Sequence, residues 1–232
     1  MFKWYTHWKF TYLLSSLVLL LIIQSFIEGL PHHRQLFHVL YSLVLIFGVL
    51  AVVQENRLRF LLTTLSILSL VGTWSNYSAG SDVNFTYILI DRIIALTYLG
   101  ILGGLILRDV IMCKRVTVDT LMGSVCAYLL IAAAWGITYS AIELANPDSF
   151  TIPAHLNHDR MDYITSLNTW FYYSFMSLTT LGYTEIRPAS RPAGTLTWLE
   201  AMAGQFYLAL LVARLVGLHT VPVSEGDKPE EK

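Results

Sequence analysis

The stretch that decides the fold reads Thr165-Ser-Leu-Asn-Thr-Trp-Phe-Tyr-Tyr-Ser-Phe-Met-Ser-Leu-Thr-Thr-Leu-Gly-Tyr-Thr-Glu185. Its first part, Thr165–Leu178, is rich in aromatic residues and predicts a helix of about 13 residues, too short to cross a bilayer. Its second part, Thr179–Glu185, holds a threonine pair followed by glycine and tyrosine. Non-helical backbone lies at membrane depth only where protein buries it or where it lines a watery cavity. The stretch therefore predicts a re-entrant helix that leads into a functional loop.

Long apolar runs surround this stretch. A spanning helix needs about 20 mainly apolar residues to cross about 30 Å of hydrocarbon. By that measure the chain has six candidate spans, the third of them short: Thr11–Ile27, Leu36–Val53, Phe60–Trp74, Phe85–Leu107, Val118–Glu143 and Gly194–Leu218. The sequence thus predicts an all-α membrane protein with six transmembrane helices. The residues after the first run lack a small-x-small cleavage site, so we expect a retained span rather than a cleaved signal.

The composition supports a membrane protein and excludes several other classes. Hydrophobic residues make up 55% of the chain and charged residues 13%, a charge content roughly half that of an average soluble domain. A net charge of −1 lacks the basic footprint of a nucleic-acid binder. The two cysteines, Cys113 and Cys126, form neither a disulfide framework nor a CxxC metal motif. We find no nucleophile motif or phosphate-binding loop, and expect no enzyme activity and no organic cofactor.

The distribution of Lys and Arg predicts the orientation. Most of these residues fall on the inside when the N-terminus is cytoplasmic, which favours that topology. Both termini then face the cytoplasm of a multi-pass protein in the inner (plasma) membrane, and the long loop between the last two spans faces outward. We expect a four-span bundle over residues 1–115, a two-span module over 116–219 and a short polar tail over 220–232. A charged link that includes Arg108, Asp109, Lys114 and Arg115 separates the first two units.

The string Ser177-Leu-Thr-Thr-Leu-Gly-Tyr-Thr-Glu-Ile186 resembles the signature of potassium channels, T-x-T-T-V-G-Y-G-D. The order of elements is similar too, with an outer span, an aromatic pore helix, the filter and a last span with a mid-helix glycine. The resemblance covers about Thr117 to His219 and indicates a small prokaryotic two-span pore preceded by four extra spans. In such channels a ring of backbone carbonyls replaces the hydration shell of the cation.

The resemblance implies a role for each residue of the loop. Thr180 matches the threonine whose hydroxyl and carbonyl form the innermost ion site, and Leu181, Gly182 and Tyr183 match the positions whose carbonyls coordinate dehydrated K⁺. Glu185 stands where the family usually has aspartate behind the outer mouth. The pore-helix aromatics that brace the filter tyrosine correspond to Tyr172 and Tyr173.

Thr184 departs from the pattern, which has a second glycine at this position. A β-branched residue enters a left-handed or strained conformation at a cost of roughly 1–3 kcal/mol. Either the loop relaxes and loses its outermost site, or the threonine hydroxyl turns inward and replaces a ligand. Both outcomes keep the inner sites and weaken the exclusion of Na⁺.

Two residues of the last span have expected roles outside the filter. Gly204 lies about 15 Å into the span and by resemblance is the gating hinge. A helix-packing glycine is the alternative. Glu200 is an intramembrane acid, which is costly unless it is paired. We expect its partner to be a backbone group or a hydroxyl behind the pore loop.

The first four spans lack the arginine ladder of a voltage sensor. A sensor needs several charges that move in the membrane field, but the fourth span holds only Arg92, next to Asp91. These two residues lie about 100° apart on a helix, so we expect each to pair with a different span and voltage gating to be shallow. His155 and His158 have the spacing of a metal site, although a solvated polar loop is favoured because no further ligands are fixed.

Together these features predict a homotetrameric channel that conducts K⁺ passively. One chain supplies one filter segment, so a closed ring of carbonyls needs four copies. Its partners are then membrane lipids, monovalent cations and its own copies. Two alternatives remain open, a weakly selective monovalent cation channel and a non-conducting membrane scaffold or sensor.

Overall fold

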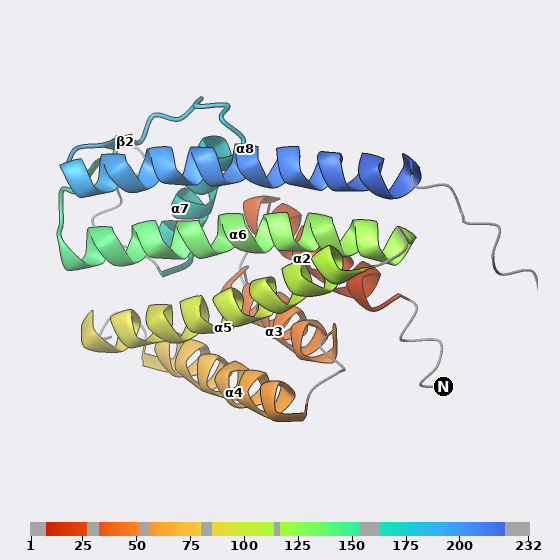
Figure 1. Cartoon of the computed structure of the whole chain (residues 1–232). Helices are drawn as coiled ribbons and strands as arrows, with labels where there is room; N and C mark the ends of the chain where they lie inside the picture. The colour runs from red at the N-terminus through yellow and green to blue at the C-terminus, as the bar shows by residue number, and fades with distance from the viewer. Residues whose placement is uncertain are drawn as a thin grey trace, which may run out of the picture.

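The computed structural model describes residues 8–26, 33–51, 56–79, 85–113, 117–153 and 163–220. These ranges are almost entirely helical (Figure 1). The helices are α2 (Lys9–Phe26), α3 (His33–Ala51), α4 (Asn56–Ala79), α5 (Phe85–Met112), α6 (Val118–Ala145), α7 (Tyr163–Leu178) and α8 (Arg191–Thr220). Two short strands, β1 (Phe150–Thr151) and β2 (Arg187–Pro188), pair antiparallel.

Each of the six predicted spans corresponds to a helix. Four helices are long and apolar enough to cross a membrane, over the stretches Arg57–Ser75, Thr86–Met112, Val118–Ala145 and Arg191–Arg214. The apolar stretches of the first two helices, Lys9–Ile23 and Gln35–Ala51, are shorter. The chain is therefore a multi-pass membrane protein, and a count of six spans stays a prediction.

The structure corrects two details of the sequence analysis. The third helix is not short, because α4 continues through polar residues to Ala79 and has 24 residues. Arg108 and Asp109 belong to α5 rather than to a link, since the helix runs on to Met112. The predominantly helical fold agrees with the expected all-α class, and the only strands among the described residues are the two-residue β1 and β2.

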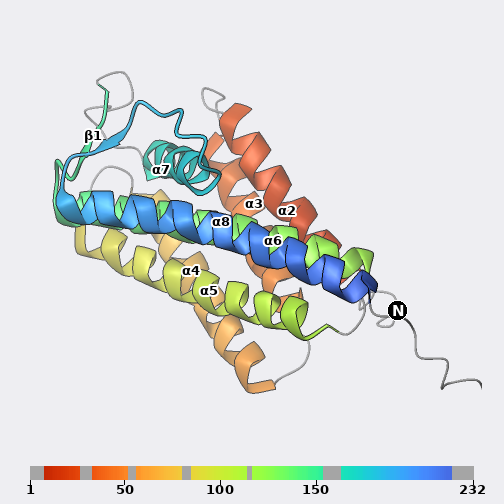
Figure 2. The same cartoon turned by 45° about the horizontal axis from the view of Figure 1, so that its top comes forward.

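The helices pack around α6. Figures 1 and 2 show α6 between α8 on one side and α5 on the other, with α4 beyond α5. One apolar core joins α2, α3, α4, α5 and α6, and its fully buried members include Leu13, Tyr98 and Leu130. The Tyr98 hydroxyl donates to the carbonyl oxygen of Leu45 at 2.9 Å, as a polar group buried in an apolar core requires. The bundle of the four N-terminal helices thus packs directly on α6.

Polar contacts gather the helix ends at one end of the bundle. Lys9 of α2 forms an ion pair with Asp109 of α5 at 3.0 Å, and Arg214 of α8 donates to the carbonyl oxygen of Cys113 at 2.7 Å. The side chain of Thr117 caps the first turn of α6 by accepting from the backbone N–H of Thr120, a common N-cap arrangement. The first and last described residues lie at this same end (Figure 1), and its cytoplasmic location stays a prediction. In the described part of the chain, neither Cys113 nor Cys126 forms a disulfide.

Asp91 and Arg92 of α5 are both buried, with 4% and 2% of their surface exposed. An Asp91 carboxylate oxygen lies close to Gly72 of α4. Arg92 lines a small cavity that residues of α2, α3, α4, α6 and α7 complete. The pairing of each charge with a different span stays a prediction.

Candidate functional site: the loop after helix α7

Helix α7 and the following loop form an excursion that leaves and rejoins one end of the bundle. The excursion starts at β1 and returns at β2, and the pairing of Phe150 with Pro188 holds its two ends together. The 16 residues of α7 span about 24 Å at 1.5 Å per residue, less than the hydrocarbon thickness. Helix α7 lies against both α6 and α8 (Figure 2). The excursion is thus folded onto the two long helices.

Close packing and a buried carboxylate position this excursion. A Cβ added to Gly136 of α6 would overlap the ring of Phe171, so the glycine allows α7 to approach α6. Behind α7, the rings of Tyr139, Phe150, Trp170 and Tyr173 pack mostly edge to face, the geometry that aromatic pairs prefer. Glu143 accepts the backbone N–H groups of Asp148 and Phe150 at 2.9 and 3.0 Å. The start of the excursion is therefore tied to the end of α6.

The loop after α7 contains left-handed residues at alternate positions. Thr180 has φ 57° and Gly182 has φ 64°. Left-handed residues at every second position turn successive carbonyls toward one side of the chain, and glycine enters this conformation at little cost. A β-branched threonine does so against strain of roughly 1–3 kcal/mol. Strained backbone of this kind persists where the surroundings hold it, and it is typical of functional sites.

Two hydrogen bonds of its side chain help to hold the strained Thr180. Its hydroxyl donates to the carbonyl oxygen of Thr179 at 2.7 Å. The side-chain amide of Gln205, on α8, donates to the same hydroxyl oxygen at 3.0 Å. The sequence analysis missed Gln205, and only its position directly after Gly204 at the expected hinge would have drawn attention to it. Helix α8 thus contacts the loop residue expected to form the innermost ion site.

The alternation of left-handed residues ends before Thr184. Among the described non-glycine residues, positive φ occurs only at Asp148 and Thr180. The hydroxyl oxygen of Thr184 accepts the backbone N–H of Ile186 at 3.1 Å, and its own N–H donates to the Gly182 carbonyl at 3.0 Å. The Thr184 hydroxyl is thus engaged with the backbone in the single chain, and its effect on the outermost site stays a prediction. The neighbouring Glu185 is exposed.

The two pore-helix tyrosines occupy different positions. The Tyr172 hydroxyl donates to the carbonyl oxygen of Tyr183 at 2.8 Å, so it contacts the loop through its backbone. Tyr173 is buried behind α7, where its hydroxyl shares a 2.7 Å hydrogen bond with Thr197 of α8. The side chains of Leu181 and Tyr183 are 66% and 81% exposed in the single chain. Tyr172 thus lies at the loop, whereas Tyr173 joins α7 to α8.

Glu200 and Gly204, one turn apart on α8, both contact α7. Glu200 is fully buried, accepts a hydrogen bond from the Tyr139 hydroxyl and shares a second hydrogen bond with the Ser174 hydroxyl. The expectation of a hydroxyl partner behind the pore loop is therefore confirmed. A Cβ added to Gly204 would overlap the carbonyl oxygen of Leu178, the last residue of α7. The structure thus gives Gly204 a packing role, and its role as a hinge stays a prediction.

A comparison with protein families finds one similarity, in the C-terminal part of the chain. A family model described as an ion channel matches residues 125–220, which include most of α6 together with α7, the loop and α8. No curated protein and no solved structure matches the chain. The described residues contain no group of three or more His, Cys, Asp or Glu side chains that could hold a metal ion. His155 and His158 lie outside the described residues. The chain is therefore a multi-pass membrane protein whose residues 125–220 are similar to a family of ion channels.

Proposed function

We propose that the chain forms a homotetrameric channel that conducts K⁺ passively through the loop Thr180–Thr184. The observation that carries this proposal is the pair of left-handed residues, Thr180 and Gly182, at alternate positions after α7. That backbone lies within the region similar to ion channels. Carbonyls directed to one side can replace the hydration shell of a cation. The Thr180 hydroxyl and carbonyl would form the innermost site, and the carbonyls of Leu181, Gly182 and Tyr183 the sites above it.

The end of α7 supports a cation at this position. The C-terminal end of a helix carries about half a negative elementary charge, and the loop follows directly after Leu178. In this proposal the excursion re-enters the membrane, α6 is the outer helix and α8 is the inner helix. Transport is electrodiffusion with repulsion between ions in adjacent sites, without covalent chemistry and without an organic cofactor.

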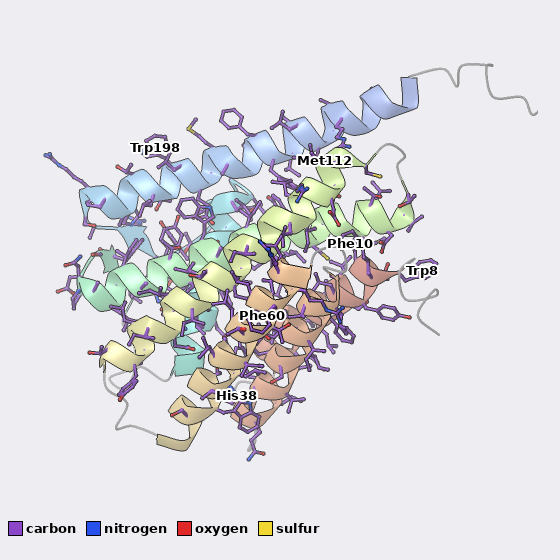
Figure 3. The ribbon with its side chains drawn as sticks, turned by 60° about the horizontal axis from the view of Figure 1, so that its bottom comes forward. Trp8, Phe10, His38, Phe60, Met112 and Trp198 are labelled. Atoms are coloured by element: carbon purple, nitrogen blue, oxygen red, sulfur yellow. The ribbon has the colours of Figure 1, made fainter. Side chains whose placement is uncertain are left out.

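Exposed apolar surface supports an assembly of several chains. Helix α8 leaves large hydrophobic side chains uncovered, and Figure 3 shows Trp198 pointing away from the other helices. Leu181 and Tyr183 in the loop are also exposed. A single chain supplies one filter loop, so a closed ring of carbonyls requires symmetric copies of the chain. Four copies would give the filter of the channel family that the chain resembles. The remaining exposed face of α8 would contact lipid.

The four N-terminal helices would act as a packing partner of the pore rather than as a voltage sensor. Arg92 is buried on α5, and this helix carries no ladder of arginines. We place both termini in the cytoplasm and the excursion on the outer side of the plasma membrane. This orientation follows from the distribution of Lys and Arg.

The filter assignment is tested by the Gly182→Val variant. A valine at φ 64° is strongly disfavoured and would disrupt the carbonyl alignment while leaving the helices in place. We expect purified wild type and Gly104→Ala to support K⁺ flux in liposomes, because a Cβ at Gly104 meets nothing within 4 Å. Gly182→Val should form the same oligomer without flux. Undiminished flux from Gly182→Val would remove the assignment, and absence of flux from all three proteins would favour the scaffold.

A weakly selective monovalent cation channel is the second candidate, because of Thr184. Its φ is not left-handed and its hydroxyl is engaged with Ile186, so the outermost site of the family pattern is altered. We expect Thr184→Gly to raise the permeability ratio of K⁺ to Na⁺, measured as a shift of the reversal potential under bi-ionic conditions. Identical reversal potentials for the two proteins would show that Thr184 has no bearing on selectivity.

A further inference from the structure

Glu200 is a fully buried carboxyl group that the ion pathway does not use. Its Oε2 accepts from the Tyr139 hydroxyl of α6 at 2.6 Å, and its Oε1 lies 2.5 Å from Ser174 Oγ of α7. The titratable groups that face it are phenols, which are uncharged near neutral pH: Tyr128 and Tyr139 of α6 and Tyr173 of α7. The ion pair of Lys9 with Asp109 lies at the other end of the bundle.

The hydrogen bonds around Ser174 reveal where the protons are. Ser174 Oγ lies 2.7 Å from the carbonyl oxygen of Ala132 and 2.5 Å from Glu200 Oε1. A serine hydroxyl has a single proton, so it cannot donate to both oxygens. If Glu200 were ionised, one of these contacts would bring two oxygens together without a proton between them. If Glu200 is protonated on Oε1, it donates to Ser174, Ser174 donates to Ala132, and Tyr139 donates to Oε2.

We propose that Glu200 is a neutral carboxylic acid and a positioning residue that holds the pore helix on the inner and outer helices. The protonated form satisfies every polar atom of the group, whereas a buried and unpaired carboxylate would be costly. The assignment of the proton stands on geometry alone. The effect on conduction rests on the function proposed above.

The contacts of α7 with α8 show how Glu200 would act on the loop. Ser174 faces Glu200, and four residues later on both helices Leu178 faces Gly204. Residues four apart lie on one face of a helix, so these two contacts form one seam. Leu178 ends α7, and Thr180 follows two residues later. A shift at Glu200 would therefore displace the end of the helix from which the filter loop starts.

Glu143 provides a matched control because its hydrogen bonds have the opposite pattern. Both of its oxygens accept backbone N–H groups, so it must be an acceptor at both positions. Glutamine at position 200 would reproduce the neutral acid, with its amide nitrogen donating to Ser174 and its oxygen accepting from Tyr139. Glutamine at position 143 would direct an N–H donor at another donor. Glu200→Gln should therefore be tolerated, whereas Glu143→Gln should destabilise the protein.

Infrared spectroscopy of the purified full chain tests the protonation directly. At neutral pH, the difference spectrum of wild type minus Glu200→Gln should contain the carbonyl stretch of a protonated carboxylic acid. In the Ser174→Ala background this band should move to higher frequency, because its hydrogen bond is lost. A carboxylate band in place of the acid band at neutral pH would overturn the proposal.

Potassium flux in liposomes tests the positioning role separately. Glu200→Gln should keep at least about half of the wild-type flux, whereas Glu200→Leu should lose about tenfold or more, because it leaves the buried hydroxyls without their partner. Wild-type flux from Glu200→Leu would overturn the positioning role. An acid band in a protein without flux would support the neutral acid and reject the channel instead, so the two failures are distinguishable.

Discussion

Replacing Gly204 with alanine should weaken the protein rather than strengthen it. Alanine is normally better than glycine inside a helix by about 1 kcal/mol. At this position, however, the new Cβ would overlap the backbone oxygen of Leu178. A backbone atom cannot move aside by a change of rotamer. Overpacking of this kind costs about 1–3 kcal/mol. The free energy of unfolding should then fall by about 0–2 kcal/mol per subunit. We expect a value in the upper part of this range, because the contact is with backbone.

Gly194→Ala on the same helix is the matched control. There the added Cβ would only touch Pro188 Cβ at 4.0 Å, an ordinary contact. The higher helix propensity of alanine should therefore stabilise the protein by up to about 1 kcal/mol. The free energies of unfolding of the two variants should differ by roughly 2–3 kcal/mol, which corresponds to about 4–12 °C in the midpoint of thermal unfolding for a chain of this size. Thermal unfolding of the purified protein, followed by circular dichroism, measures this difference. Equal gains in midpoint for the two variants would show that α7 and α8 do not touch at Gly204, and would leave the hinge as the reason for the glycine.

Three further predictions concern the loop and the N-terminal bundle. Gln205→Leu removes the amide that donates to Thr180. Ba²⁺ is a divalent ion with a radius similar to that of K⁺, and its block of K⁺ flux should become roughly two- to twelvefold weaker, which is the equivalent of one hydrogen bond. Unchanged block would show that Gln205 does not act on the innermost ion site. Tyr172→Phe removes the donor to the Tyr183 carbonyl, and the ratio of K⁺ to Na⁺ permeability should fall by up to the same factor; an unaltered reversal potential would rule this out. Arg92 and Arg108 are the two arginines of α5 and lie too far apart to form a ladder. Open probability in planar bilayers should therefore change shallowly with voltage, and a curve as steep as that of a multi-arginine sensor would contradict this.

The helices were predictable because membrane helices leave a strong local signal. A pore helix was expected at Thr165–Leu178, and α7 is Tyr163–Leu178. Its C-terminal end was predictable because the aromatic run stops just before the threonine pair. The third helix was expected too short, because the polar residues after Trp74 do not signal a span although the backbone stays helical to Ala79. The strand pair has two residues on each side, too few for any alternation to be visible.

The contacts of the site were less predictable because they join distant segments. Glu200 could be expected to need a partner, since buried acids are costly, but only the packing of three helices identifies Tyr139 and Ser174. The contact between Gln205 and Thr180 likewise depends on how α8 crosses the end of α7. Motif and composition thus indicate which residues matter. The crossing of the helices decides what those residues touch.

The reversal potential of the purified wild-type protein, with K⁺ on one side of a bilayer and Na⁺ on the other, tests the central claim most directly. A carbonyl filter built from Thr180–Tyr183 should conduct, and its current should reverse at a potential that shows a preference for K⁺. A current that reverses near zero would mean that the loop does not discriminate by dehydrating K⁺ at aligned carbonyls. A bilayer that contains the assembled protein but carries no current would contradict the claim that this loop is an ion pathway.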